Sequence, residues 1–377
     1  MNDLAPEQRR HGIRRLIIQL KRRGKPDAAN PVYRQIRSEW QDGQIRDFEA
    51  LKLLAAEAAA KRDKEAWLNL LVAFDPAMAK LSRDAVPVLF GIGRNTLNSG
   101  RLVEVDGERR FEKIYVRGSS CFRQMRHAYA DVLEPLAPVT FAPIRALHWG
   151  ERLVAVQFGF VDGAGSFQRQ PKVALRIARQ LGEVALSQAK EPTAGKRLIQ
   201  TYPGGMKRAR ATLLTHLGKS NRRVSARLAL QGSWRERMAT AVDMVISADN
   251  ALVSALPDLL DRWSARVEGM GRVFSHGDLN RPNIARHGAL IDWDCAGWRA
   301  YGYDAAYATA FHAKNVDMGA LRALSKSEVE RPGSEIPDRF AYFYFLLHHM
   351  TVENALRLRL RVAKALVAEL EALEARF

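Results

Sequence analysis

One short stretch, Ser275–Asn283, constrains this chain more than any other part of its sequence. It carries a carboxylate, Asp278, and a carboxamide, Asn283, and a second carboxylate, Asp292, follows at the end of an apolar strand. Phosphoryl transfer needs an acid group that orients an attacking hydroxyl and accepts its proton, and it needs oxygen ligands that hold magnesium on the nucleotide phosphates. The stretch therefore predicts a phosphoryl-transfer site in which Asp278 is the base and in which Asn283 and Asp292 hold Mg²⁺.

The residues of this stretch resemble a known family. His276, Asp278 and Asn283 reproduce the H-x-D-x-x-x-x-N loop of protein-kinase-like phosphotransferases. The sequences HGDL and IDWD are typical of the aminoglycoside phosphotransferase and choline kinase branch of that superfamily. The resemblance implies that Asp278 is the catalytic aspartate, that Asn283 and Asp292 are the magnesium ligands, and that Asp304 braces the catalytic loop. We expect His276 to be a structural member of the loop, with its ring bonded to the backbone. The hairpin between Asn283 and Asp292 is shorter than in the family pattern, and its turn is expected at His287-Gly288.

The resemblance also implies the fold class, which is α+β. We expect a two-lobed protein-kinase-like fold with a small antiparallel β lobe, a large and mainly helical lobe, and an added N-terminal helical extension. The expected segments are the helical extension over 1–84, a nucleotide-covering β-sheet over 85–161, and a helical lobe over 162–377 with the catalytic loop and the substrate region. Residues 48–74 favour helix because they are rich in Ala, Leu, Glu and Lys with apolar residues three and four apart. Apolar residues at helical spacing also predict helices over 173–189, 235–267 and 339–377.

Short apolar runs broken by Gly and Asp replace the helical pattern between residues 84 and 163. They predict strands with a turn at Asp106-Gly107 and a further turn after the fourth strand. The strands are expected at 86–90, 101–105, 110–116, 141–147 and 153–161.

Lys113 lies on the third of these strands. A lone lysine on an alternating strand usually marks only a solvated face, but the resembled fold places one cation here to pair the α- and β-phosphates of ATP. The loop expected over 91–100, which carries Gly91, Gly93 and Asn95, is predicted to position the same phosphates, although glycine-rich turns are common for other reasons.

The sequence departs from the family pattern in the helix expected from Ser119 onward. The early glutamate that usually pairs with the strand lysine is absent, because Phe122–Arg126 contains no acid. Asp131 and Glu134 come later, so either one of them substitutes or Lys113 is held in another way. The departure favours a weakened or regulated enzyme.

The net charge of +18 is informative about the binding partner of the protein rather than about its fold. A strongly basic protein attracts anions and repels polycations such as aminoglycosides, so we expect a small-molecule or glycan acceptor that is acidic or phosphorylated. A basic region between Lys190 and Arg237 suits such an acceptor. Nucleic acid is not favoured, because no regular aromatic residues interleave with the basic ones. The alternative is an Arg-rich composition spread over solvated faces.

The two cysteines, Cys121 and Cys295, fit a reducing compartment. The first residues lack the apolar core of a signal peptide, and no apolar run approaches the ~20 residues of a membrane span. We therefore expect a cytoplasmic protein. The basic segment 9–25 also allows peripheral membrane contact, although a helix docked on its own domain is the simpler reading.

Three other readings of the central stretch stay open. A metal-dependent phosphoesterase would use His276, Asp278, His287 and Asp292, but such sites need more histidines at several strand ends. A kinase-fold binding or scaffolding module with little turnover agrees with the missing glutamate, but the retained oxygen ligands count against it. Nucleotidyl transfer on the same fold depends on how the nucleotide lies. The leading prediction is ATP- and Mg²⁺-dependent transfer of a γ-phosphoryl group to a hydroxyl.

Overall fold

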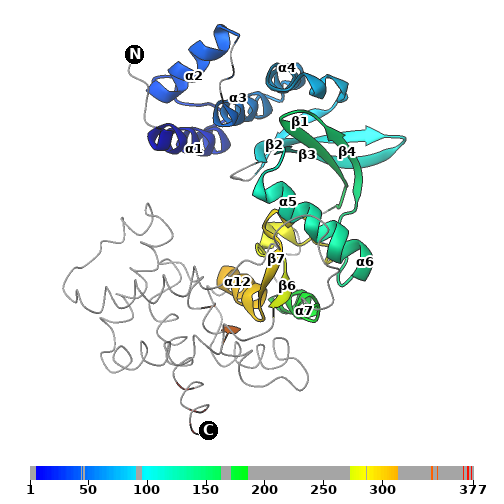
Figure 1. Cartoon of the computed structure of the whole chain (residues 1–377). Coiled ribbons are helices and arrows are strands. Elements are labelled where there is room, and N and C mark those ends of the chain that lie inside the picture. Colours follow the sequence, from blue (N-terminus) through cyan, green and yellow to red (C-terminus); the bar gives the residue numbers. More distant parts are fainter. Residues whose placement is uncertain are drawn as a thin grey trace, which may run out of the picture. The chain divides into compact units, whose positions relative to one another are not determined.

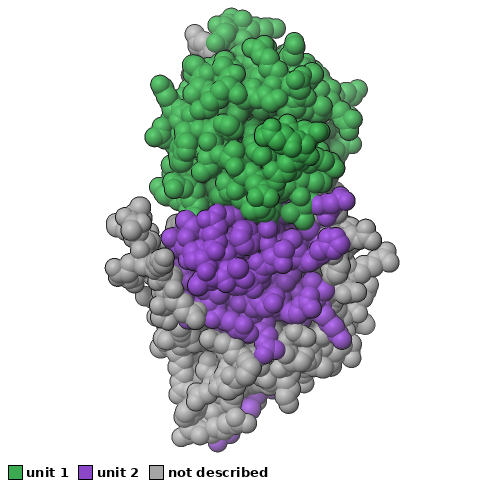
Figure 2. Space-filling view, turned by 90° about the vertical axis from the view of Figure 1, so that its right-hand side faces the viewer, with its two compact units in different colours: residues 1–126, 142–161 green, residues 127–141, 162–377 purple. Residues whose placement is uncertain are grey.

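The computed structural model divides the chain into two compact units. The sheet unit comprises residues 1–126 and 142–161, and the loop unit comprises residues 127–141 and 162–377 (Figure 2). The domain boundaries expected from the sequence stay a prediction. The structure describes residues 6–43, 45, 47–90, 96–162, 171–185, 272–285, 287–312, 341–342, 346, 368, 372 and 375.

Helices begin the sheet unit (Figure 1). The side chains of Asn30, Asp47 and Asp63 accept backbone N–H groups at the starts of three of them, which satisfies donors that a helix leaves unpaired. The stretch 48–74 is two helices rather than one, because Arg62 adopts a positive φ of 56° and Asp63 then caps the next helix. The helices are α1 (Pro6–Arg23), α2 (Pro31–Gln41), α3 (Phe48–Ala60) and α4 (Lys64–Phe74), and a 3₁₀ turn follows at Pro76–Lys80.

A five-stranded antiparallel sheet completes the unit, with strand order β1-β2-β3-β5-β4. All five predicted strands are present, and the turn at Asp106-Gly107 is confirmed by positive φ angles of 53° and 76°. The strands are β1 (Val86–Leu89), β2 (Thr96–Val105), β3 (Glu108–Val116), β4 (Ile144–Trp149) and β5 (Leu153–Gly159).

The glycine-bearing loop predicted over 91–100 is wrong in its second half. Thr96 pairs with Tyr115 and Gly100 pairs with Lys113, so residues 96–100 belong to β2. A Cβ on Gly100 would collide with the carbonyl oxygen of Glu112. The close approach of this backbone explains why a glycine occurs inside the strand. Gly91, Gly93 and Asn95 lie outside the described residues.

The added helices and the sheet share one core. Leu97, Ile114, Leu153 and Ala155 of the sheet pack in the same buried cluster as the apolar residues of α1, α3 and α4. The apolar face of α1, which the sequence allowed to contact a membrane, is buried in this cluster.

An ion pair is buried in the sheet unit. Arg101 and Glu112 are both 0% exposed, and Arg101 Nε lies 2.8 Å from Glu112 Oε1. Gln157 donates to the other carboxylate oxygen at 3.1 Å, and the guanidinium group lies 5.0 Å from the ring centroid of Trp67 in α4. Glu112 and Ile114 share one face of β3, so the pair lies on the face that the helices cover.

Asp75 connects the end of α4 to the β4–β5 turn. Its carboxylate accepts the backbone N–H groups of Arg152 and Leu153, both at 2.8 Å, and that of Ala77 at 3.2 Å. Burial raises the pKa of Asp75, but these backbone donors outweigh burial and leave the pKa below its ordinary value.

The loop unit contains a helical run, a two-stranded sheet and the helices around it. The helix predicted after Ser119 is α5 (Ser120–His127), which begins in the sheet unit and continues through a π-helical segment (Ala128–Leu133) into α6 (Glu134–Leu136). The helix predicted from Val173 ends earlier than expected, as α7 (Pro171–Gly182). The remaining elements are β6 (Arg272–Ser275), 3₁₀ turns at Arg281–Asn283 and Trp293–Cys295, β7 (Gly297–Ala300) and α12 (Tyr303–His312).

The turn predicted at His287-Gly288 is confirmed. Gly288 has a positive φ of 79°, and Ile284 pairs with Leu290 across the turn. The basic region 190–237 and the helix predicted over 235–267 lie outside the described residues, as does nearly all of 339–377. Within the described part of the chain, every helix is too short or too polar to cross a bilayer.

Candidate active site

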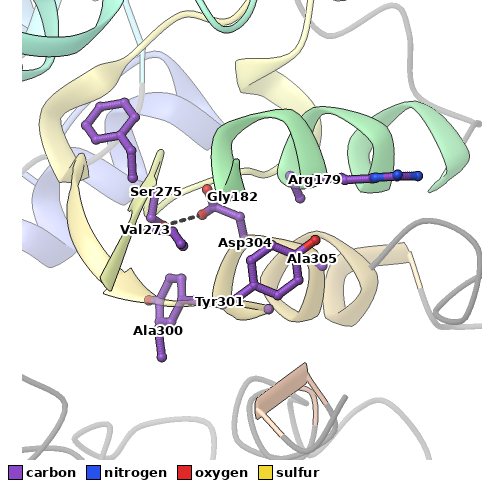
Figure 3. Close-up of a pocket in the computed structure, with 12 residues that line it drawn as sticks. Arg179, Gly182, Val273, Ser275, Ala300, Tyr301, Asp304 and Ala305 are labelled. Atoms are coloured by element: carbon purple, nitrogen blue, oxygen red, sulfur yellow. Dashed lines mark hydrogen bonds between the residues drawn. The ribbon is translucent and has the colours of Figure 1, made fainter. Parts of the chain in front are cut away.

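Asp304 holds the start of the predicted catalytic loop. It lies in the first turn of α12 and is 5% exposed. Its carboxylate accepts the hydroxyl of Ser275 at 2.8 Å, which Figure 3 shows, and the backbone N–H groups of His276 at 2.6 Å and Gly277 at 2.9 Å. One side chain thus fixes three consecutive residues at the end of β6.

Gly277 is required at its position in the loop. Its φ of 79° is in the left-handed region, and a Cβ there would collide with the guanidinium group of Arg299 and the carbonyl oxygen of Cys295. Arg299 occupies this space because it donates to the Ser275 hydroxyl at 3.1 Å and to the Cys295 carbonyl at 2.7 Å.

His276 is completely buried and bonds to the backbone through both ring nitrogens. Nε2 lies 2.9 Å from the carbonyl oxygen of Ile291, and the backbone N–H of Asp278 points at Nδ1 from 3.3 Å. A carbonyl needs a donor and an N–H needs an acceptor, so this network assigns a neutral ring with its proton on Nε2. The ring also packs beside Trp293, with centroids 4.6 Å apart.

The carboxylate of Asp278 is partly exposed and is held by three side chains. Oδ1 accepts the Tyr307 hydroxyl at 2.5 Å and the Asn280 amide at 2.8 Å. The Asn283 amide nitrogen lies 2.8 Å from the Asp278 carbonyl oxygen and 3.2 Å from Oδ2. Because the amide nitrogen of Asn283 faces Asp278, its amide oxygen is the atom left for a metal ion.

Asp292 lies next to Asn283 across the short hairpin. The N–H of Ile291 donates to the carbonyl oxygen of Asn283 at 3.1 Å, which brings the two segments together. Asp292 is exposed and has a positive φ of 65°, immediately before the 3₁₀ turn that starts at Trp293. The structure therefore groups Asp278, Asn283 and Asp292 in one part of the loop unit.

Lys113 lies in the sheet unit, on β3. It is 5% exposed, and its Nζ lies 5.2 Å from the ring centroid of Tyr115 and 5.8 Å from that of Phe90. Of the two acids suggested as its partner, Asp131 contacts Nδ1 of His127 at 2.5 Å, and Glu134 is exposed. The role of Lys113 stays a prediction.

A comparison with family models decides the class of this protein. Residues 99–336, more than half of the chain, match the model named APH and described as the phosphotransferase enzyme family. The chain belongs to this family. The resemblance and the fold class predicted from the sequence are therefore confirmed. This phosphotransferase has the α+β, two-lobed protein-kinase-like fold, with helices added before the small β lobe.

Solved structures similar to the phosphotransferase include an aminoglycoside phosphotransferase from Alicyclobacillus acidocaldarius, 14% identical over 76% of this chain and 92% of that chain, with a TM-score of 0.47. A choline kinase from Cryptosporidium parvum is 14% identical over 83% and 96%, with a TM-score of 0.40. A mutant aminoglycoside phosphotransferase, APH(4)-Ia with ADP and hygromycin B, is 13% identical over 80% and 98%, with a TM-score of 0.42. No curated protein matches the chain.

The donor atoms of the phosphotransferase fit Mg²⁺. Asn283 offers an amide oxygen and Asp292 a carboxylate, and Mg²⁺ commonly binds through one or two carboxylates together with substrate phosphates and water. Within the described ranges, no group of three or more His, Cys, Asp or Glu side chains could hold a metal ion.

Two residues at the site were missed by the sequence analysis. Asn280 and Tyr307 both donate to the Asp278 carboxylate. Tyr307 follows Asp304 by one helical turn, and residues three apart lie on the same face of a helix. Once Asp304 was expected to face the catalytic loop, this spacing could have identified Tyr307 as well.

A small pocket of the phosphotransferase lies beside Asp304, between α7, the β6–β7 pair and the start of α12 (Figure 3). Its lining includes Arg179, Gly182, Val273 and Tyr301, and the Tyr301 ring packs so closely on Gly182 that a Cβ there would collide with it. Asp278 is not among the lining residues, so we assign the pocket to packing beneath the loop.

Proposed function

We propose that this phosphotransferase transfers the γ-phosphoryl group of ATP, with Mg²⁺, to a hydroxyl of a small-molecule or glycan acceptor. The observation that carries the proposal is the environment of Asp278. Its loop is braced by Asp304, its carboxylate is partly exposed, and one of its oxygens has no close donor among the described residues other than Asn283 at 3.2 Å. A carboxylate held in this way can orient a hydroxyl and accept its proton.

The roles proposed for the other residues follow from their atoms. The amide oxygen of Asn283 and the carboxylate of Asp292 would hold Mg²⁺, which supplies positive charge to the phosphate oxygens as the transferred group leaves. Lys113 is proposed to bind the α- and β-phosphates. The site would act mainly by placing the acceptor hydroxyl in line with the phosphorus atom and by neutralising charge.

We propose an acidic or phosphorylated acceptor. The formal net charge of +18 supports this class, because a protein of such charge attracts anions and repels polycationic aminoglycosides. A screen for ADP release against separate pools of acidic sugars, phosphorylated metabolites, anionic glycolipids and aminoglycosides tests the class. Turnover confined to the aminoglycoside pool would contradict it.

Replacing Asp278 with Ala tests the catalytic assignment. We expect phosphoryl transfer to fall by about 10²–10⁴-fold, because the general base is removed. The affinity for ADP should change little, since the proposed phosphate ligands are retained. Calorimetric titration with ADP and a coupled ADP-release assay measure the two quantities. Lys113→Met is the comparison variant for Asp278→Ala. Its affinity for ADP is expected to fall, because the cation proposed to bind the phosphates is removed.

The same assays separate the alternatives, provided that phosphate and adenylate release are followed independently. Adenylate transfer to the acceptor would indicate a nucleotidyl transferase. A binding module with little turnover is the second candidate, favoured by the absence of an acid in Phe122–Arg126. It would bind ADP without transferring phosphate to any pool. Wild-type turnover in Asp278→Ala would contradict the assignment of the base.

A further inference from the structure

The two oxygens of the Asp278 carboxylate are not equivalent. Oδ1 accepts two hydrogen bonds, from the Tyr307 hydroxyl at 2.5 Å and the Asn280 amide at 2.8 Å. A carboxylate oxygen has two lone pairs, so these donors occupy both. Oδ2 has one donor among the described residues, the Asn283 amide at 3.2 Å. As far as the described part of the chain shows, the lone pair of the carboxylate without a donor is therefore on Oδ2.

Tyr307 is held in place by the helix that also braces the loop. It lies one turn after Asp304 on α12, and its ring stacks on that of Tyr303 with centroids 6.2 Å apart and planes at 15°. The guanidinium group of Arg299, which contacts the loop, lies 4.5 Å from the Tyr303 ring centroid. The Tyr307 hydroxyl therefore reaches Asp278 from the helix α12 rather than from a loop.

The phenol of Tyr307 remains a donor over the ordinary pH range. Burial raises its pKa well above the usual value for tyrosine, and the charge and hydrogen bond of Asp278 raise it further. A neutral phenol facing a carboxylate donates a charge-assisted hydrogen bond, which is stronger than one between neutral groups.

We infer that Tyr307 is a positioning residue that, with Asn280, holds the Asp278 carboxylate in one rotation and directs Oδ2 to the acceptor hydroxyl. The inference rests on the proposed function. In the step itself, the acceptor oxygen forms a bond to the γ-phosphorus and its proton passes to Oδ2 of Asp278. The bond from the γ-phosphorus to the bridging oxygen of ATP breaks, and its electron pair leaves with ADP.

Tyr307→Phe tests the inference, because it removes the hydroxyl and keeps the ring that stacks on Tyr303. We expect kcat for ADP release from ATP with Mg²⁺, measured with water as the acceptor, to fall about tenfold to a hundredfold. The KM for ATP and the thermal unfolding midpoint should stay near their wild-type values. A loss confined to kcat identifies a positioning role, since a structural defect would also change the unfolding midpoint.

Tyr342→Phe is the matched control. Tyr342 is buried whereas Tyr307 is half-buried, and the Tyr342 hydroxyl donates to Thr309 at 3.3 Å instead of to Asp278. It should retain the wild-type kcat. The inference is overturned if Tyr307→Phe keeps the wild-type kcat, or if Tyr342→Phe loses as much.

Failure of the proposed function gives a different result, which is a wild-type protein that releases no ADP with water or with any acceptor pool. In that case a crystal structure of Tyr307→Phe still decides the inference. A rotated Asp278 carboxylate supports the positioning role, and an unchanged carboxylate overturns it.

Discussion

Two buried carboxylates of the sheet unit and the carboxylates around the predicted loop of the loop unit differ in how fully protein donors surround them. In the sheet unit, Glu112 and Asp75 are both 0% exposed, and protein donors bind them from several sides. In the loop unit, Asp304 is buried in the same manner, but Asp278 is partly exposed and Asp292 is exposed.

The difference separates structural carboxylates from those available to a ligand. Buried polar groups are almost always satisfied by hydrogen bonds, and a carboxylate whose oxygens are all occupied has no lone pair for a substrate. Each of the saturated carboxylates connects separate segments. Asp75 connects the end of α4 to the β4–β5 turn, Glu112 connects β3 to β2 and β5, and Asp304 connects α12 to the end of β6. Among the described residues, Oδ2 of Asp278 accepts one donor, the Asn283 amide at 3.2 Å, so a lone pair of this oxygen is left for a ligand.

The largest effect is expected from breaking the buried ion pair of the sheet unit. Glu112→Ala leaves the Arg101 charge buried without its partner and should lower the free energy of unfolding by about 3–5 kcal/mol. Urea denaturation followed by circular dichroism measures it. The double variant Arg101→Met/Glu112→Leu should recover most of the loss, because no charge is then left unpaired. If Glu112→Ala lowers the free energy of unfolding by less than about 1 kcal/mol, a structural role for Glu112 is contradicted.

Asp304→Ala should affect both stability and turnover. It leaves the N–H groups of His276 and Gly277 without their acceptor, and each unsatisfied buried donor costs about 1–3 kcal/mol. Since these residues immediately precede Asp278, phosphoryl transfer should fall by about 10²-fold. Unfolding and ADP-release assays on one preparation give both values. Full activity in a destabilised protein would contradict the bracing role.

Asp75→Asn is the variant of the sheet unit to compare with Asp304→Ala, because Asp75 also accepts backbone N–H groups but lies outside the proposed site. The neutral amide oxygen of Asn accepts more weakly than the carboxylate from the Arg152 and Leu153 N–H groups, and the amide NH₂ cannot accept from Ala77, so we expect a loss of about 1–2 kcal/mol and unchanged turnover per folded molecule. A large loss of turnover at full stability would place Asp75 with the catalytic residues instead.

The effect of Asp75 should also depend on pH in a definite direction. Its pKa is lowered in the folded protein, so its contribution to stability is fully present above the unfolded pKa of about 3.9 and is lost as the pH falls through the lower folded value. The difference between the wild type and Asp75→Asn should therefore be constant near neutral pH and shrink below about pH 4. Unfolding midpoints across this range measure it, and a difference that grows on acidification would contradict the assignment.

The strand pattern and the proximity of Asp278 to Asn283 could be predicted because they depend on residues close together in the chain. Asp278 and Asn283 share one short loop, so their spacing alone brings them together. Alternating apolar residues located all five strands, but the boundary at Thr96 was missed, since only pairing with β3 extends β2 to that residue.

Sequence alone thus determined the family, the strand pattern and the close approach of Asp278 and Asn283, which lie at a fixed short spacing. Tertiary structure decided which oxygen of Asp278 has fewer donors among the described residues, because the Tyr307 donor comes from a helix 29 residues away. It also decided that Asp75 joins the added helices to a turn 77 and 78 residues further on. The physical reason is that a carboxylate has the same local sequence pattern whether it is saturated or open, and only packing supplies the distant donors that distinguish the two.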